Sequence, residues 1–432
     1  MRENLLEDSQ YLHLNLATLR LLDEKEAAKK SGSNCHLKNP RLAIFNTQPP
    51  HLYFGGVERR IIETGKRQHN EVDITIYSGT KGGFKKPVFF DGMNIVPCFS
   101  TDVLFPVDNW FFNHALADSE NTLEADVYEA HNASGYELLR SLKKKTKKPP
   151  FIETVHGVLA DEYLQTQSST SLSPRERLTN LLMARLARLE GESARNANLV
   201  VTVSNYSAEK AVQLYGVEEA KTRVVPNGVN PDRFKPANDS ESMKRKLGIV
   251  NKSMVLFVGR LIPRKGLNFL IEAAKRIINE NADTIFAIVG NGPLRNKLAS
   301  QLDKANLSKN FLFFGDVKES ILPAIYNCTD VFAFPSIQEG QGIALLEAQA
   351  SAKPVVAFRV GGVNEAVSDG NSGLLVERGD TDGLAEAILK ILSNSRLRER
   401  MGRKGREFVL QNFTWDLCAK TMLGVYNEAL SV

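Results

Sequence analysis

Residues 253–273 read SMVLFVGRLIPRKGLNFLIEA, and this stretch decides the fold. It begins with a short apolar run rich in β-branched and aromatic residues, which is typical of a buried strand. A loop with glycine, proline and basic residues follows, and the remainder has the spacing of an amphipathic helix. A strand that leads directly into a helix is the repeating unit of a parallel, doubly wound sheet.

The same alternation of strand and helix recurs on both sides of this stretch. The apolar runs before it are RLAIFNT, VDITIYSG, DVYEAHN, PFIETVHG, NLVVTVSN and TRVVPNG. The apolar runs after it are TIFAIVGNG, FLFFGD, DVFAFPS, PVVAFRVGG and GLLVE. Because longer amphipathic segments separate these runs, the sequence predicts an α/β protein with two Rossmann-like, doubly wound domains.

The length of 432 residues exceeds what one hydrophobic core supports, so a domain boundary is expected near the middle. Residues 226–236, PNGVNPDRFKP, are rich in turn residues and mark the connection. We expect an N-terminal extension over 1–38, an N-terminal acceptor domain over 39–228 and a C-terminal donor domain over 229–407. A helix over 408–432, with apolar residues at helical spacing, would close the structure.

Composition narrows the class of protein. The hydrophobic fraction of 42% and the charged fraction of 24% are those of a soluble globular protein. No apolar run is long enough to span a bilayer and the first residues lack a signal-peptide core, so we expect a cytoplasmic protein. The four cysteines show no metal-site spacing, which predicts reduced thiols. A net charge of +5 suits anionic small molecules, an anionic membrane or nucleic acid alike.

The loop within the opening stretch carries the first candidate site, because ligands of open α/β sheets bind beyond the carboxyl ends of strands. Gly259 and Arg260 follow the apolar run, and Lys265 precedes the helix. Glycine admits close backbone approach, a helix N-terminus offers free N–H groups, and the two cations would neutralise charge, so a diphosphate fits. A solvated basic loop is the alternative. Gly290, in the turn GNGP, has only part of a dinucleotide fingerprint, and ordinary turn geometry explains it better.

Residues 337–348, IQEGQGIALLEA, form the second candidate site. Glu339 lies in a glycine-rich loop at a strand end, and Glu347 lies about two turns into the next helix. Carboxylates accept hydrogen bonds from hydroxyl groups, so the pair suits one extended ligand with several hydroxyls. A surface glutamate and an unrelated glutamate on a helix face remain the alternative.

The N-terminal half contributes one glycine pair and two histidines. Gly55 and Gly56 follow the first apolar run, where a phosphate or sugar could pass close to the backbone; a simple hinge is the alternative. His131 and His156 end two further runs and would face the same edge of the sheet. A lone histidine is usually structural, but two at strand ends favour a functional role, with His156 the stronger candidate.

In their order along the chain, these motifs resemble glycosyltransferase family 4, a family of retaining enzymes with the GT-B fold. The resemblance extends from Arg41 to the C-terminus and rests on an ordered set of motifs. They are FNTQPPHLYFGGVER, TVHG, VTVSNYSAEK, VVPNGVNPDRFKP, VLFVGRLIPRKGLNFLIEA, IVGNGP, EGQGIALLEA and VVAFRVGGVNEAV. The resemblance implies two Rossmann-like domains facing each other across a cleft, with the acceptor entering between them.

The resemblance also implies residue roles. Arg260 and Lys265 would hold the donor diphosphate, Glu347 the ribose and Glu339 the sugar hydroxyls, with His156 beside the reacting sugar. The expected donor-binding residues are Gly56, Gly259, Arg260, Lys265, Gly290, Glu339, Gly340, Gln341, Gly342, Ile343 and Glu347. Gln341 departs from the family, where an aromatic residue is common at this position.

The implied reaction moves a sugar from a UDP- or GDP-sugar to a hydroxyl of a glycan, lipid-linked or small-molecule acceptor. Anomeric configuration would be retained without a protein nucleophile, and the departing phosphate would take the acceptor proton. No cofactor and no metal are implied, and no DxD motif is present in a suitable position. A catalytically silent sugar-nucleotide-binding subunit and another GT-B enzyme, such as a sugar-nucleotide epimerase, are the alternatives. No nucleic-acid recognition motif is present.

Two basic segments are relevant to whether the protein binds a membrane surface. Residues 142–149 read LKKKTKKP, and residues 174–189 place leucine and methionine on one side of a helix with several arginines. Such segments hold some proteins on the inner face of an anionic membrane, although a solvated surface is the commoner explanation. The sequence is consistent with membrane binding and with a solvated surface.

Overall fold

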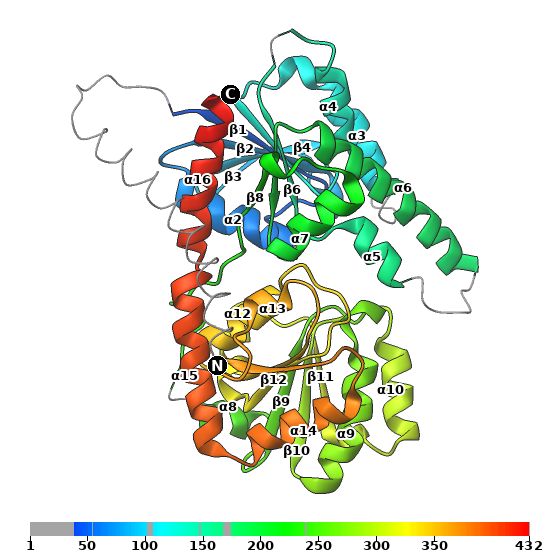
Figure 1. The fold of residues 1–432 in the computed structure, drawn as a ribbon, viewed down its shortest axis with the longest axis vertical. Coiled ribbons are helices and arrows are strands. Elements are labelled where there is room, and N and C mark those ends of the chain that lie inside the picture. The colour runs from blue at the N-terminus through cyan, green and yellow to red at the C-terminus, as the bar shows by residue number, and fades with distance from the viewer. Residues whose placement is uncertain are drawn as a thin grey trace, which may run out of the picture.

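The computed structural model describes residues 39–53, 55–101, 107–146, 148–166, 174–237 and 240–431. It contains two α/β domains, one above the other, and each has a largely parallel sheet packed against helices (Figure 1). The predicted α/β class with two doubly wound domains is therefore confirmed. The expected N-terminal extension, residues 1–38, lies outside the described residues.

The N-terminal domain contains an eight-stranded sheet with the order β3-β4-β2-β1-β5-β6-β7-β8. Each apolar run predicted for this domain forms one of its strands. The strands are β1 (Arg41–Asn46), β2 (Asp73–Gly79), β3 (Val88–Phe90), β4 (Met93–Cys98), β5 (Val127–His131), β6 (Phe151–Val155), β7 (Leu199–Thr202) and β8 (Thr222–Val224). The strand order reverses beside β1, which is where ligands bind in sheets of this kind.

An edge hairpin that the sequence analysis did not identify joins β3 to β4. β3 is antiparallel to β4, whereas the other described pairs in this sheet are parallel. The turn is Asp91-Gly92, whose φ angles of 48° and 82° are both left-handed, as a tight hairpin turn requires. All three residues of β3 are exposed, so the run carries no burial pattern that marks it as a strand.

Helices cover both faces of the N-terminal sheet, and each face has its own hydrophobic core. They are α2 (Gly56–Gln68), α3 (Val107–Asp118), α4 (Tyr136–Leu142), α5 (Leu159–Thr166), α6 (Pro174–Asn196) and α7 (Asn205–Lys210). One core joins Ile61 of α2 to Ile44 and Ile76 of the sheet. The opposite core joins Phe112 of α3 and Leu139 of α4 to the other face.

The C-terminal domain has a fully parallel six-stranded sheet with the order β11-β10-β9-β12-β13-β14. Its strands are β9 (Ser253–Val258), β10 (Thr284–Val289), β11 (Phe311–Gly315), β12 (Val331–Phe334), β13 (Val355–Phe358) and β14 (Gly373–Val376). Its helices are α8 (Ser240–Lys246), α9 (Leu267–Glu280), α10 (Arg295–Lys304), α11 (Leu322–Cys328), α12 (Ile343–Ala350), α13 (Val363–Ala366), α14 (Thr381–Leu392) and α15 (Ser395–Asn412). The strands of this sheet are almost wholly apolar because both faces are covered.

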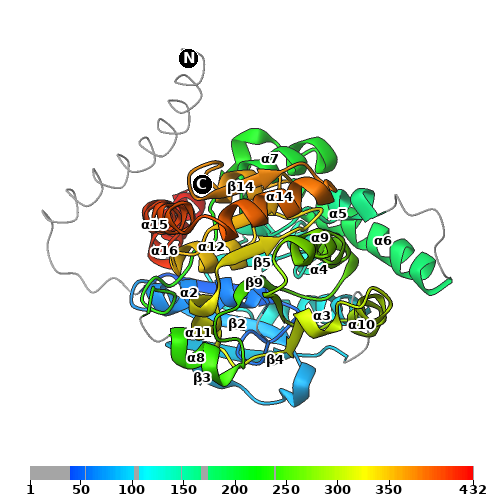
Figure 2. The same cartoon turned by 90° about the horizontal axis from the view of Figure 1, so that it is seen from below.

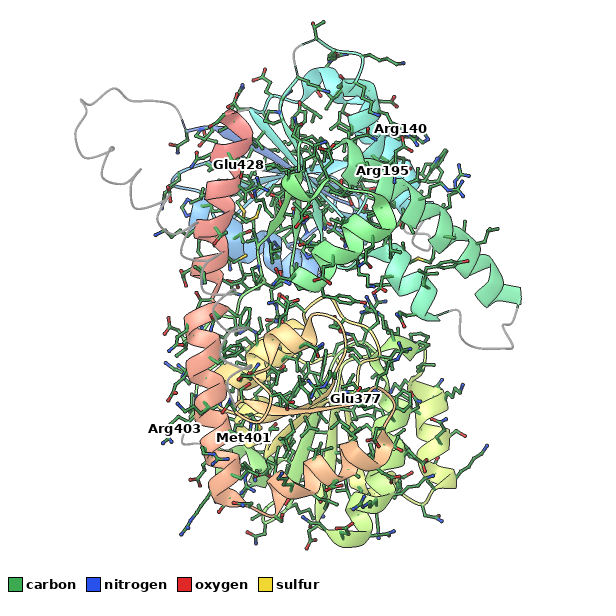
Figure 3. All side chains as sticks on the ribbon, in the orientation of Figure 1. Arg140, Arg195, Glu377, Met401, Arg403 and Glu428 are labelled. Atoms are coloured by element: carbon green, nitrogen blue, oxygen red, sulfur yellow. The ribbon has the colours of Figure 1, made fainter. Side chains whose placement is uncertain are left out.

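The last helix, α16 (Trp415–Ser431), returns from the C-terminal domain and packs on α2 and β5 of the N-terminal domain (Figures 1 and 2). Residue 408, where we expected the closing helix to begin, lies within α15. Trp415, Met422 and Tyr426 are buried as the helical spacing indicated, but Leu417 is 36% exposed. Figure 3 labels Glu428 near the end of α16, where its carboxylate pairs with Arg223 at 2.5 Å.

The chain thus passes between the domains twice, and the two passages touch. The backbone N–H of Val229 donates to the carbonyl of Phe413 at 2.9 Å, and the N–H of Trp415 donates to the carbonyl of Val229 at 3.3 Å. Gly228 lies so close to this second passage that a Cβ atom there would meet backbone atoms of Thr414 and Trp415. The glycine is therefore required by close backbone approach.

Candidate active site

The domains meet at the loops that follow β6 and β12. A Cβ atom on Gly340 would collide with the carbonyl oxygen of His156, so the two loops are in direct backbone contact. A Cβ atom on Gly56, at the start of α2, would lie 3.5 Å from Cδ1 of Ile343. Four of the predicted site residues, from three separate stretches of sequence, therefore lie at this interface.

Lys265 and Glu339 form an ion pair there. Lys265 ends a short 3₁₀ turn before α9, and its Nζ lies 2.5 Å from Oε2 of Glu339. Burial lowers the pKa of Lys265, and Glu339 opposes that shift. Burial disfavours the charge of Glu339, but Lys265 and Arg264 outweigh it and bring the pKa of Glu339 below its ordinary value. The two side chains are therefore held together as a buried ion pair.

Arg260 is exposed beside this pair, and none of the ion pairs among the described residues involves it. Its charge acts on Glu58 of α2, so it lies near the opposite domain. Gly259 and Gly290 come together at the ends of β9 and β10, where a Cβ atom on Gly290 would meet the carbonyl oxygen of Gly259. The φ of Gly290 is 116°, which only glycine adopts readily.

Glu347 is almost fully buried and takes part in a network that spans the domains. Tyr326 donates to its Oε2 at 2.9 Å, and Arg59 of α2 forms an ion pair with Oε1. Arg59 also lies 2.5 Å from Oε1 of Glu319 in the C-terminal domain. Burial raises the pKa of Glu347, whereas Arg59 and Tyr326 counteract that rise. The carboxylate expected to bind ribose thus has an arginine from the other domain as its partner.

Arg59 is a site residue that the sequence analysis did not single out. It lies three residues after Gly56 in the stretch GGVERR, so it shares the first turn of α2 with a predicted donor-binding position. Its partner is 288 positions away in the sequence. Its nearness to Gly56 was the available signal, but nothing in the sequence indicates that distant pairing.

The loop from Gly340 to Ile343 leads directly into α12. Gly342 has a φ of 91° and precedes the first residue of that helix, Ile343. The side chain of Gln341 is buried and points to the interdomain passage, where its Oε1 accepts from the backbone N–H of Asn227 at 2.8 Å. The residue that departs from the family pattern therefore engages the connection between the domains.

His131 and His156 lie side by side at the ends of β5 and β6. Nδ1 of His131 is 2.8 Å from Nε2 of His156, and Nε2 of His131 faces Oε1 of Glu129 at 3.5 Å. Burial lowers the pKa of His131 to about 4, and burial followed by the neighbouring His131 lowers the pKa of His156. Tyr426 of α16 donates to Oε2 of Glu129 at 2.6 Å. A neutral histidine pair is therefore positioned by the last helix.

Three further polar contacts hold the two domains together beside the site. Glu365 accepts hydrogen bonds from the backbone N–H groups of Asn205 and Tyr206, each at 2.8 Å. Gln338 donates to Asp161 at 3.2 Å. Because each contact joins one domain to the other, the interface around the predicted donor residues is closed.

Neither a metal cluster nor a membrane span is found in the part of the chain that the structure describes. Those residues contain no group of three or more histidines, cysteines, aspartates or glutamates arranged to hold a metal ion. No helix among them combines the length and apolar character needed to cross a bilayer.

Comparison with known families gives two adjacent matches. Residues 54–233 match the model of the family described as Glycosyltransferase Family 4, and residues 239–408 match that of Glycosyl transferases group 1. D-inositol 3-phosphate glycosyltransferase from Corynebacterium jeikeium is 30% identical over 65% of this chain and 67% of its own length. The chain belongs to glycosyltransferase family 4. Each of the two family matches coincides with one of the α/β domains of this family 4 protein.

The name of a second relative specifies the sugar donor of that enzyme. GDP-mannose-dependent alpha-(1-6)-phosphatidylinositol monomannoside mannosyltransferase from Mycolicibacterium smegmatis is 34% identical over 51% of this family 4 chain. The matched stretch spans 59 to 60% of the length of that enzyme and of two other relatives.

Solved structures confirm the fold of this family 4 protein. Sucrose-phosphate synthase from Thermosynechococcus elongatus superimposes with a TM-score of 0.78 at 21% identity, covering 91% of this chain and 100% of that one. The Anabaena protein HepE in complex with UDP and glucose gives 0.72 at 21% identity, covering 90% and 100%. The expected GT-B fold, with two Rossmann-like domains, is therefore confirmed.

Proposed function

We propose that this chain is a retaining glycosyltransferase that moves a hexose from a UDP- or GDP-sugar to an acceptor hydroxyl. The observation that carries the proposal is the meeting of two cations and two carboxylates with His156 at one interdomain interface. Arg260 and Lys265 are suited to a diphosphate, and Glu339 and Glu347 to sugar and ribose hydroxyls. Membership of family 4 supports this assignment.

The charge of the site favours loss of a nucleoside diphosphate. Negative charge builds on the departing phosphate in the transition state, and fixed cations in a water-poor interface stabilise it strongly. Arg260 has no ion-pair partner among the described residues and is free to bind the phosphate. Lys265 is within reach once the sugar hydroxyls compete with it for Glu339. We propose that these side chains supply the positive charge and that no metal or cofactor is required.

The proposed chemical step takes place on one face of the sugar. The acceptor oxygen bonds to the anomeric carbon while the bond from that carbon to the diphosphate oxygen breaks, and the departing phosphate takes the hydroxyl proton. The products are a glycoside of unchanged configuration and a nucleoside diphosphate. His156 is proposed to contact the reacting sugar as a neutral hydrogen-bonding group, which agrees with its lowered pKa. Catalysis then consists of positioning and electrostatic stabilisation.

The names of similar proteins point to two nucleotide bases, guanine and uracil, that need to be tested for the donor. The mannosyltransferase from Mycolicibacterium smegmatis is named for GDP-mannose, and the Anabaena protein was solved with UDP. We propose a nucleoside diphosphate sugar as the donor and a glycan or lipid-linked hydroxyl as the acceptor. We further propose peripheral contact with the cytoplasmic face of a membrane, supported by exposed Lys143, Lys144 and Lys148 on the N-terminal domain.

The test is a panel of UDP- and GDP-sugars in EDTA, scored by thermal stabilisation and by slow donor hydrolysis. We expect one sugar nucleotide to raise the unfolding temperature by mass action. Glu339→Gln and Lys265→Met each lower donor hydrolysis about 100-fold, because each removes a charge aimed at the donor. Glu272→Gln, which breaks an exposed pair with Lys275 on α9, is the matched control and leaves hydrolysis unchanged.

Three outcomes would contradict the proposal. If no sugar nucleotide stabilises the protein, the assignment of the donor site is wrong. Binding without hydrolysis or transfer to any acceptor would indicate a silent binding subunit. Conversion of the donor into an isomeric sugar without transfer would indicate an epimerase.

A further inference from the structure

An apolar groove lies between α3, α4 and α6 of the N-terminal domain, away from the residues assigned to the donor. Its walls are Trp110 of α3, Tyr136 of α4, and Leu182, Leu186 and Leu189 of α6. The groove has a volume of about 180 Å³ and is lined almost entirely by hydrocarbon and aromatic surface. A soluble protein gains nothing by leaving such a surface open to water, so an apolar ligand is indicated.

The apolar groove opens at the same edge of the sheet as the active site. α3 follows β4 and α4 follows β5, so both helices begin where the strands end. Tyr136 starts α4 only five residues after His131. Asn109, beside Trp110, donates to Oγ1 of Thr47, the residue that follows β1, at 2.9 Å. This hydrogen bond joins the groove to the loop that follows β1.

A free cation lies at the apolar groove. Arg185 is exposed on α6 between Leu182 and Leu186, and no ion pair in the described part of the chain involves it. Arg140 of the neighbouring helix, labelled in Figure 3, is in contrast tied to Glu192 with an N–O distance of 2.9 Å. The contact between Arg140 and Glu192 fixes α4 against α6, whereas Arg185 remains available for an anion.

Exposed aromatic rings continue the apolar groove across the surface. Trp110 is 46% exposed and packs edge-on against Phe111, with ring centroids 4.8 Å apart. Phe111 in turn contacts Phe99, which is 58% exposed, at 6.0 Å. Exposed aromatic side chains, of which Trp110 also carries an N–H donor, are typical of surfaces that meet lipid. Figure 2 shows α6 projecting from the body of the molecule.

We propose that the apolar groove binds the hydrocarbon chain of an amphiphilic acceptor whose head group carries a phosphate. Arg185 binds the phosphate, the chain lies against Trp110 and Leu182, and the acceptor hydroxyl reaches toward His156. This inference rests on the proposed function, because it names the class of acceptor for that transfer. The charge of Arg185 and the apolar walls together select an anionic amphiphile over a free sugar.

Binding of dodecyl phosphate, kept below its micelle-forming concentration, tests the proposal by tryptophan fluorescence. The chain has two tryptophans, and Trp415 is buried at the interface of α16 whereas Trp110 lines the groove. We expect dodecyl phosphate to shift the emission to shorter wavelength, and Trp110→Phe to abolish that shift. Inorganic phosphate, which lacks the chain, should produce none.

Adjacent residues of α6 provide a matched pair of variants. Leu182→Gln removes one wall of the groove and should weaken binding of dodecyl phosphate about tenfold. Leu181→Gln changes a neighbouring leucine that is 67% exposed and does not line the groove, and it should bind as the wild type does. Arg185→Gln should bind dodecyl phosphate and neutral dodecyl maltoside equally, whereas the wild type prefers the phosphate.

Two results would overturn the inference. Equal binding of dodecyl phosphate by the Leu181 and Leu182 variants would show that the groove does not hold the chain. Loss of binding to phosphatidylglycerol vesicles in both variants, with dodecyl phosphate binding unchanged, would indicate general membrane contact. Donor hydrolysis by the wild type and by Leu181→Gln, which lies outside the groove, separates this failure from that of the proposed function, since both should hydrolyse the donor at the same rate.

Discussion

At the scale of single residues, the neighbour of His156 decides which of its nitrogens can meet the substrate. Nε2 of His131 lies 3.5 Å from the carboxylate of Glu129 without a hydrogen bond to it, and a proton on this nitrogen would leave Nδ1 of His131 as an acceptor. Nε2 of His156 must then donate across the 2.8 Å contact. The remaining nitrogen of His156 is an acceptor that can receive a hydrogen bond from a sugar hydroxyl. His131 is thus a positioning residue for His156.

Replacement of His131 should change the pH dependence of the reaction. Burial and then His131 lower the pKa of His156, so removing His131 raises that pKa toward 6.5. We expect His131→Asn to lose kcat/KM at a higher pH than the wild type does as the pH falls, because only burial and Arg60 then lower the pKa of His156. The measurement is kcat/KM between pH 5 and 8. If kcat/KM falls at the same acidic pH in the wild type and in the variant, His131 does not position His156.

The same substitution should change the pH dependence of stability. The pKa of His131 is about 4 in the folded protein and about 6.5 when unfolded, so the unfolded state binds the proton first as the pH falls. The depressed pKa therefore costs stability between about pH 7 and pH 4, by up to about 3 kcal/mol. We expect His131→Asn to lose less free energy of unfolding than the wild type between pH 7 and 5, measured by urea denaturation. A larger loss in the variant would contradict this assignment.

At the scale of elements, the contact between the two interdomain passages depends on Gly228. A methyl group there would push against the backbone of Thr414 and Trp415, so Gly228→Ala must separate the passages. We expect a loss of about 2 to 3 kcal/mol in the free energy of unfolding, followed through Trp415 fluorescence in urea.

Gly248→Ala is the control for this substitution. Gly248 also has a left-handed φ of 68°, but nothing lies within 4 Å of its Cβ position. We expect that variant to lose only about 1 kcal/mol, from backbone strain alone. Equal losses in the two variants would show that the packed passages contribute little.

The elements that the sequence predicts are those with an unmistakable pattern. The strands of the C-terminal sheet, such as Ser253–Val258, are continuous apolar runs because both faces are buried. Glu339 and Lys265 were chosen as candidates because ligands bind at strand ends and helix starts, and the structure pairs them. The hairpin of β3 lacks burial, and the pair of Arg59 with Glu347 joins distant segments, so neither could be found from local pattern.

At the scale of the whole molecule, side chains of the two domains meet directly across the interface. Arg59 links α2 to both Glu347 and Glu319 across the interface. A ribose that binds Glu347 must therefore share or displace this arginine. Donor binding and domain closure involve the same carboxylate.

Removal of Arg59 should open the molecule. We expect Arg59→Met to increase the radius of gyration in small-angle scattering, because Glu347 loses its partner from the other domain. A double-mutant cycle with Glu347→Gln should give a coupling energy of about 1 kcal/mol or more. Arg41→Gln, which breaks exposed pairs within the N-terminal domain, is the control and should leave the radius unchanged. If Arg59→Met leaves the radius of gyration unchanged, the other interface contacts are sufficient to keep the domains closed.

The return of α16 to the N-terminal domain has a consequence for how the protein is made. One core of that domain contains Trp415, Met422 and Tyr426 together with residues of β1 and β2. The ribosome releases those partners almost last, after the entire C-terminal sheet has emerged. The core on this face of the N-terminal sheet therefore stays incomplete until α16 has emerged. Nascent chains stalled before residue 415 should expose an apolar face that chaperones bind.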